Sequence, residues 1–205
     1  MLVSDRTLAG GDEPLLRAVQ EAVAGGADAV QLREKDLPRD ELLSLARGLR
    51  EATRGRALLL VSGELDVALA AEADGVHLPE QAPYVERPRE GFLAGRSVHS
   101  LEAARAAAGE GVDYLVAGPV YETRTHPGRV PAGLSLVEAV SAVGPPVLAI
   151  GGVTAGRVEG VVRAGASGVA VISAVLAAGD PRAAAGALRR VLDAAWLAVG
   201  TAPEP

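Results

Sequence analysis

Short apolar runs that alternate with helical stretches predict a single (β/α)8 barrel for this chain of 205 residues. Residues 147–150 and 168–172 are unbroken apolar runs of strand length, and the stretch between them is long enough for a helix. Unbroken apolar strands are typical of parallel sheets that are covered on both faces. The alternation continues along almost the whole chain and yields eight strands. We therefore expect one domain over residues 1–205, without a linker or a second domain.

The eight expected strands are separated by stretches with helical signals. The strands are 2–3, 29–33, 58–61, 75–78, 95–98, 113–117, 147–150 and 168–172. Asp12, as N-cap, and Pro14, in the first turn, mark the start of the first helix. Ser100 is expected to cap an alanine-rich helix after the fifth strand. Further helices are predicted over 40–53, over 135–143 and from 180 to about 199.

Two longer stretches lack a helical pattern. Residues 79–90 contain three prolines, and residues 118–133 form the longest irregular stretch of the chain. A long loop at the strand ends is commonly a lid over a ligand. The last residues, 200–205, are expected to fray.

Composition argues against several classes of partner. The net charge of −6 provides no basic field for nucleic acid, and three tyrosines, one phenylalanine and one tryptophan offer few stacking surfaces. The absence of cysteine excludes disulfides and thiolate metal sites. No apolar segment is long enough to span a membrane, and the first residues lack the apolar core of a signal peptide. We expect a soluble, cytoplasmic protein that binds a small molecule, and a homo-oligomer is compatible with the sequence.

Glycines and a helix start follow the last two expected strands. Gly151 and Gly152 allow backbone N–H groups to approach a ligand closely, and a helix that begins near Ser173 would present further N–H groups to an anion. The loops after strands seven and eight of such barrels frequently bind phosphate. The alternative is that the glycines only permit tight turns. We predict a phosphate site at these strand ends.

Polar residues at the end of the second strand predict another anion contact. Gln31, Arg33 and Lys35 lie at alternate positions, so their side chains point the same way. Two cations at the mouth of a barrel are costly unless they meet an anionic ligand. Lys35 is also the one lysine among twenty basic residues, which suggests a place where a compact ammonium is needed. The alternative is a solvated strand end whose charge Glu34 and Asp36 balance.

Hydroxyl and imidazole groups follow two further strands. The fifth strand ends in Ser97 and His99, and the long loop after the sixth strand contains Thr123, Thr125 and His126. We expect the three hydroxyl groups to contact the substrate. Because imidazole titrates near neutrality, His99 and His126 are the candidates for acid–base catalysis, although either could be solvated. The third histidine, His77, lies inside the fourth strand and is interpreted as a hydrogen-bonded core residue.

Five motifs carry a resemblance to a known family. They are QLREK at 31–35, GRSVHS at 95–100, DYLVAGPVYETRTHPG at 113–128, AIGGVT at 149–154 and AGASGVAVISA at 164–174. Together they resemble the thiamine phosphate synthase and TenI superfamily, in an order and spacing that agree over nearly the whole chain. The resemblance implies a phosphate site at Gly151, Gly152, Ile172 and Ser173, with Gln31, Arg33 and Lys35 at the other end of the pocket.

This superfamily implies two chemistries. Thiamine phosphate synthase joins a pyrimidine diphosphate to thiazole phosphate and uses magnesium, held in part by aspartates after strands three and four. Here those positions read Ser62-Gly63 and Glu80-Gln81-Ala82, so both aspartates are absent. TenI-like proteins lack the same aspartates and convert a carboxythiazole phosphate into its aromatic tautomer without a metal.

The resemblance therefore leads us to expect a TenI-like thiazole tautomerase, an isomerase of thiamine biosynthesis that needs no cofactor. GRSVHS and the Glu-Thr of VYET resemble this branch more closely than the synthase. The base of the branch is a histidine where this chain has Pro119, so His99 or His126 is expected to act as the base. Two alternatives stay open: a magnesium-dependent synthase, which is a transferase, and a phosphate-binding or regulatory barrel without catalytic activity.

Overall fold

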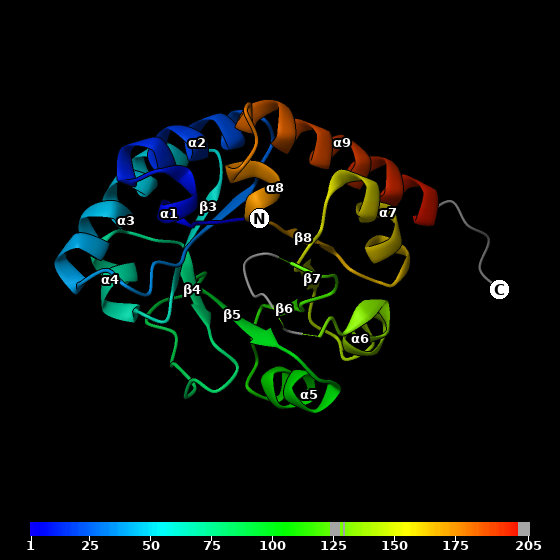
Figure 1. Ribbon diagram of the computed structural model, residues 1–205. Coiled ribbons are helices and arrows are strands. Elements are labelled where there is room, and N and C mark those ends of the chain that lie inside the picture. The colour runs from blue at the N-terminus through cyan, green and yellow to red at the C-terminus, as the bar shows by residue number, and fades with distance from the viewer. Residues whose placement is uncertain (124–127, 129, 201–205) are drawn as a thin grey trace.

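Eight parallel strands run in chain order around a barrel in the computed structural model, which describes residues 1–123, 128 and 130–200. They are β1 (Leu2–Val3), β2 (Ala29–Leu32), β3 (Leu58–Ser62), β4 (Gly75–Leu78), β5 (Leu93–Val98), β6 (Tyr114–Ala117), β7 (Val147–Ile150) and β8 (Gly168–Ala170). The first and last strands meet where Leu2 bridges to Val171 and the Val3 N–H donates to the Val171 carbonyl at 2.9 Å. The predicted (β/α)8 barrel is confirmed (Figure 1).

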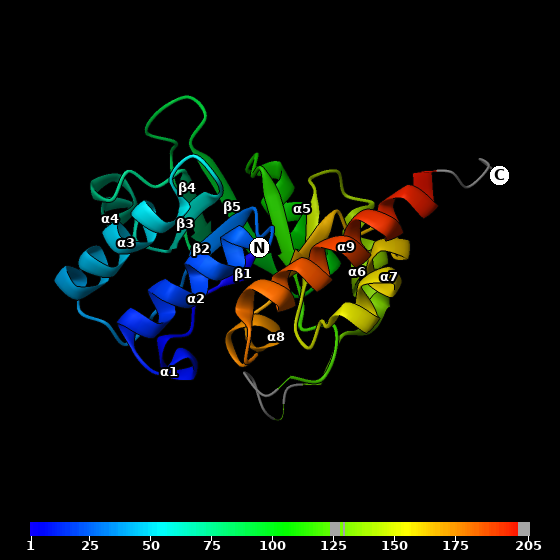
Figure 2. The ribbon, with the colours of Figure 1, turned by 90° about the horizontal axis from the view of Figure 1, so that it is seen from above.

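Helices cover the outside of these strands (Figures 1 and 2). They are α1 (Arg6–Ala9), α2 (Asp12–Ala24), α3 (Arg39–Thr53), α4 (Leu65–Ala70), α5 (Leu101–Gly109), α6 (Gly133–Ser141), α7 (Ala155–Arg163), α8 (Ser173–Leu176) and α9 (Pro181–Gly200). The long α9 packs on both α2 and α7, so it joins the two ends of the helical layer. None of the helices in the described part of the chain is long and apolar enough to cross a membrane.

Local capping explains the main departure from the expected helices near the N-terminus. The Asp5 side chain accepts a hydrogen bond from the Leu8 N–H at 2.9 Å and caps α1, a single turn that the sequence pattern does not predict. The next helix begins at Asp12 itself, and Gly11 rather than Asp12 occupies the N-cap position.

The structure also corrects expectations in the second half of the chain. Ser100 accepts from the Ala103 N–H at 3.1 Å, which confirms the predicted cap of α5. β8 ends at Ala170, because Ile172 has left the strand conformation and serves as the N-cap of α8. Gly200 belongs to α9 rather than to a frayed tail, and residues 201–205 lie outside the described residues.

Side chains from several strands fill the interior of the barrel. Val3, Leu60, Tyr114, Val116 and Ala170 form one buried cluster there, and larger clusters lie between the strands and the helices. The strands are thus buried on both faces, as their unbroken apolar runs predict. The interior of the barrel is therefore a packed core, and a cavity lies above it at the carboxyl ends of the strands. In this fold the functional groups lie at that end of the barrel.

One connection lacks the helix that the fold normally places there. Residues 79–92 join β4 to β5 without a helix, as the prolines predict, and protrude as a loop in Figure 2. Phe92 at the end of this segment is 1% exposed, so the segment supplies part of the core that a helix would otherwise form.

We predict that Gly95→Ala destabilises the barrel by about 2–3 kcal/mol, because overpacking a closed interior has a cost of this order. A Cβ at Gly95 would overlap the ring of Tyr114 inside the barrel. Urea unfolding followed by circular dichroism measures the change. Gly109→Ala on α5 is the control, since nothing lies within 4 Å of the added methyl group. Equal stability of both variants would contradict the packing described here.

Candidate functional site

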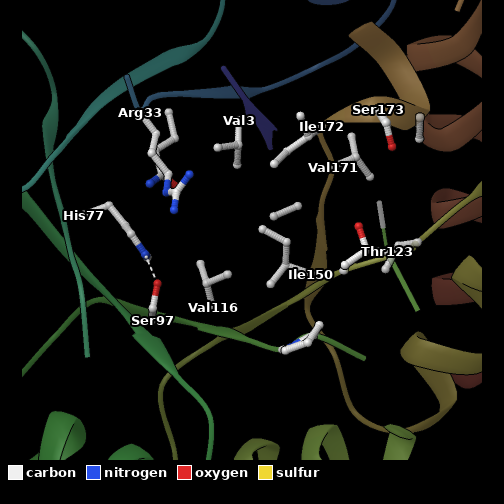
Figure 3. Close-up of a pocket in the computed structure, with 18 of the residues that line it drawn as sticks. Val3, Arg33, His77, Ser97, Val116, Thr123, Ile150, Val171, Ile172 and Ser173 are labelled. Atoms are coloured by element: carbon white, nitrogen blue, oxygen red, sulfur yellow. Dashed lines mark hydrogen bonds between the residues drawn. The ribbon is translucent and has the colours of Figure 1, made fainter. Parts of the chain in front are cut away.

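A cavity of about 600 Å3 opens where the carboxyl ends of the strands meet. Every predicted site residue that the structure describes lines it, namely Gln31, Arg33, Lys35, Ser97, His99, Thr123, Gly151, Gly152, Ile172 and Ser173. Thr125 and His126 lie outside the described residues. Figure 3 shows Arg33 and His77 on one side of the cavity and Thr123 and Ser173 on the other. Residues that bind the same ligand have to line the same cavity, and these do. The role of each residue stays a prediction.

Residues after β7 and β8 that line the cavity have backbone N–H groups without an acceptor among the described residues. Gly152 has a φ of 63°, and a Cβ at this position would overlap the carbonyl oxygen of Glu122. Glycine therefore permits a turn that a larger residue would block. Within the described residues, the N–H groups of Gly152, Ser173 and Ala174 donate no hydrogen bond. Three such donors on neighbouring strand ends can hold one phosphate group.

Arg33 and Lys35 also line the cavity, and neither has a carboxylate partner among the residues that the structure describes. The adjacent acids bind Arg6 instead: Asp36 pairs with its Nη2 at 2.6 Å, and Glu34 accepts from its N–H at 3.1 Å. The hydrogen bond from Arg6 lowers the pKa of Asp36, whereas burial raises the pKa of Glu34. The two cations are therefore available to an anionic ligand.

His77 is a neutral polar group in the wall of the cavity. Its ring is buried, with Nδ1 at 3.1 Å from the Tyr114 hydroxyl and Nε2 at 2.8 Å from the Ser97 hydroxyl (Figure 3). Burial, together with the charges of Arg33 and Arg96, lowers the pKa of His77 to about 3. The interpretation of His77 as a hydrogen-bonded core residue is confirmed, and the residue also lines the cavity.

His99 is oriented by Glu80, which follows β4. The Oε2 atom of Glu80 accepts from the backbone N–H of His99 at 2.6 Å and lies 2.9 Å from its Nδ1. Burial would raise the pKa of Glu80, but the hydrogen bonds from His99 outweigh burial and the pKa is lowered. A charged carboxylate therefore fixes the imidazole at the cavity wall.

The sequence pattern misses two charged contributions to this cavity. Arg157 on α7 donates to the Gly152 carbonyl at 2.7 Å, and its guanidinium lies 4.5 Å from the centroid of the Tyr121 ring. Its position in the first turn of the helix after the two glycines is the signal that could have identified it. The pairing of Glu80 with His99 spans 19 residues, and no local pattern predicts it.

The donor set of the cavity does not fit a magnesium ion held by the protein. Mg²⁺ takes oxygen ligands, above all carboxylates and water, in octahedral geometry. Gly63 and Ala82 stand where the resemblance places the metal aspartates, and the Oε2 atom of Glu80 is engaged by His99. Across residues 1–123, 128 and 130–200, no group of three His, Cys, Asp or Glu side chains could hold a metal ion.

The fold and the cavity define a class, the (β/α)8 barrels whose strand ends carry groups suited to anions. A family model described as thiamine monophosphate synthase matches residues 1–175, and the chain belongs to this family. The family works in thiamine biosynthesis, and its substrates are small molecules.

Individual relatives are similar over most of their length. The thiamine-phosphate synthase of Methanoculleus marisnigri is 49% identical over 181 residues, which cover 85% of this chain and 86% of that protein. The thiamine-phosphate synthase of Anaeromyxobacter dehalogenans is 42% identical and covers 96% of this chain and 90% of its own. Among solved structures, thiamine phosphate pyrophosphorylase from Pyrococcus furiosus has a TM-score of 0.84 at 38% identity and covers 95% of each chain.

These relatives overturn the tautomerase interpretation. Proteins 41% to 49% identical to this chain are named thiamine-phosphate synthase, so the expectation of a TenI-like isomerase is wrong. That expectation depended on two absent metal aspartates and on the likeness of GRSVHS and the Glu-Thr of VYET to the TenI-like branch. Without these aspartates, other groups must supply the positive charge that binds an anionic ligand. The absence of the aspartates does not determine which bonds of the substrate are formed or broken, so it cannot identify the reaction.

We predict that Gly152→Ala weakens the binding of inorganic phosphate by about tenfold or more, which corresponds to about 1.4 kcal/mol. The added methyl group would overlap the Glu122 carbonyl and displace the N–H groups of this turn. Isothermal titration calorimetry gives the affinity. Gly156→Ala on α7 is the control, since nothing lies within 4 Å of its Cβ. An unchanged affinity in Gly152→Ala would contradict the phosphate site.

His77 should make the stability of the folded protein depend on pH. Its pKa is about 3 in the folded state and about 6.5 in an unfolded chain, so between about pH 6.5 and pH 3 the unfolded state takes up the proton and the folded state does not. This contribution to stability is therefore lost as pH falls, by about 2 kcal/mol between pH 7 and pH 5. We expect His77→Gln to lose correspondingly less stability over this range in urea titrations. Identical pH profiles would contradict the neutral, buried ring.

Proposed function

We propose that the protein is a thiamine-phosphate synthase, which joins hydroxymethylpyrimidine diphosphate to thiazole phosphate and releases inorganic diphosphate. The names of its relatives support this reaction. The observation that carries the proposal is that one cavity is lined both by the N–H donors after β7 and β8 and by two cations after β2 that lack a carboxylate partner among the described residues. A coupling enzyme has to hold a monophosphate and a diphosphate at the same time, and this cavity offers one place for each.

The monophosphate of the thiazole suits the donors at Gly152, Ser173 and Ala174. Arg157, tethered to the Gly152 carbonyl, adds a positive charge on the same side. The aliphatic side chains of Val116 and Ile150 lie between the two sides of the cavity (Figure 3). They provide an apolar surface on which the thiazole ring can pack while its phosphate is held.

The diphosphate carries the larger negative charge and suits Arg33 and Lys35. A guanidinium can bind two phosphate oxygens at once, and an ammonium adds a compact charge beside it. Ser97, next to Arg33 and hydrogen-bonded to His77, offers a neutral hydroxyl group to the pyrimidine ring. This arrangement directs the reactive methylene carbon toward the middle of the cavity.

The coupling exchanges one bond for another. The ring nitrogen of the thiazole forms a bond to the methylene carbon of the pyrimidine, and the bond from that carbon to the diphosphate oxygen breaks. The electron pair of the broken bond leaves with the diphosphate, and the thiazole becomes a thiazolium cation. Arg33 and Lys35 stabilise the charge that develops on the leaving group. His99 in its protonated form can donate a further hydrogen bond, with Glu80 compensating its charge.

Incubation of the protein with both substrates and Mg²⁺, followed by chromatography, tests the proposal. We expect thiamine phosphate and inorganic diphosphate to accumulate in equal amounts. Absence of both products, while calorimetry still detects binding of thiazole phosphate, would contradict the proposal and favour a barrel that binds phosphate without catalysis.

Removal of the positive charge of Arg33 or of Lys35 should weaken the binding of the pyrimidine diphosphate and not that of thiazole phosphate. In Arg33→Gln and Lys35→Met we expect the KM for the pyrimidine diphosphate to rise about tenfold or more, since charged hydrogen bonds to an anion are among the strongest. The KM for thiazole phosphate should change less than about threefold, because its phosphate contacts other groups. Steady-state kinetics with each substrate varied separately measure both constants. Arg17→Gln on the exposed side of α2 is the control, and a rise confined to the thiazole KM would reverse the assignment.

A further inference from the structure

A buried arginine holds the connection that lacks a helix. Arg96 on β5 is 3% exposed, and because its neighbour Ser97 faces the cavity, Arg96 points to the outer side of the sheet. Its Nη1 donates to three backbone carbonyls of residues 79–92, those of Pro79 at 3.2 Å, Glu80 at 3.1 Å and Ala82 at 2.6 Å. The Pro79 carbonyl also accepts from the Ala82 N–H at 3.0 Å, whereas the guanidinium supplies the donor for the carbonyls of Glu80 and Ala82, which a helix would pair with backbone N–H groups.

Arg96 is also linked to the helix that follows β5. Its Nη2 pairs with Glu110, the C-cap residue of α5, at 2.7 Å. The guanidinium is thereby fixed at one end by α5 and binds the connection with the other. An arginine that is both buried and fixed in this way can hold a backbone segment in a single position.

The segment held by Arg96 contains the residue that orients His99. The backbone of Glu80 accepts from Arg96, while its side chain accepts from the backbone N–H and lies beside Nδ1 of His99. We propose that Arg96 is a positioning residue of the site, which acts through Glu80 to place the His99 ring at the cavity wall. Arg96 does not line the cavity, so its effect on a ligand is indirect.

Arg50 provides a matched control, because its environment is chemically similar but remote from the cavity. It is 8% exposed, donates to the carbonyls of Glu72 at 3.2 Å and Ala57 at 3.4 Å, and pairs with Asp74 at 2.8 Å. None of these residues lines the cavity. Arg50→Met therefore removes the same kind of buried contact without affecting the Glu80 segment.

The first arm of the test reads the His99 ring directly by NMR and needs no activity. With only three histidines in the chain, the ring ¹⁵N shifts of His99 can be assigned. We expect Arg96→Met to change the Nδ1 shift, because the hydrogen bond to Glu80 is lost, and Arg50→Met to leave it unchanged. Glu110→Gln weakens the ion pair that fixes the guanidinium and should change the Nδ1 shift in the same direction but less than Arg96→Met does, since the carbonyl contacts of Arg96 persist. Should Arg96→Met not fold, Arg96→Lys is compared in the same way, with an intermediate shift expected.

The second arm rests on the proposed synthase function. Arg96→Met should lower kcat by about 10- to 100-fold, the range expected when a site group moves by about an ångström, with the KM for thiazole phosphate unchanged. Glu80→Gln should lower kcat similarly, and the double variant should fall no further than either single variant. The proposal would be overturned if Arg96→Met and Arg50→Met gave the same Nδ1 shift and the same kcat. It would also be overturned if the losses of kcat in the two single variants multiplied in the double variant. If the wild type couples no substrates, the proposed function fails and the NMR arm still decides the role of Arg96.

Discussion

The cavity depends on closure of the sheet between β1 and β8. β1 contains only two residues, yet it pairs with β2 on one side and meets Val171 on the other. This places one strand, β1, between the ends of β8 and β2, and two strands between the ends of β7 and β2, although more than a hundred residues separate them in sequence. The N–H donors of Gly152 and Ser173 and the cations of Arg33 and Lys35 face one space because the barrel is closed. No local feature of the chain could bring these groups together.

The cavity contains positively charged side chains although the protein as a whole is negatively charged. The net charge of the chain is −6, so long-range attraction does not draw anions toward the protein, and binding has to come from groups at short range. Two acids near the cavity are engaged elsewhere, Asp36 with Arg6 and Glu80 with His99, while Glu122 lines the side of the cavity that carries Gly152 and Arg157. Arg33 and Lys35 are left without carboxylate partners among the described residues. The arrangement gives a negative protein a cavity that favours negative ligands.

The sequence predicts those parts of the fold and site that depend on short stretches of chain. Strand alternation, the paired glycines, the row at 31–35 and Ser100 as a cap are all patterns within a few residues, and the structure confirms their placement. The pairs Glu80–His99 and Arg96–Glu110, and Arg157 beside Gly152, depend on which elements pack together, so no short pattern reveals them. The predicted tautomerase reaction is wrong for a different reason, since residues absent from a site do not identify the bonds that the remaining residues help to break.

A crystal structure of the protein with both expected products, thiamine phosphate and inorganic diphosphate, tests the central claim most directly. The account predicts that the phosphate of thiamine phosphate contacts the N–H groups of Gly152 and Ser173, and that the diphosphate lies against Arg33 and Lys35 in the same cavity. The account would be contradicted if the two products occupied separate cavities, or if the diphosphate were bound away from both cations.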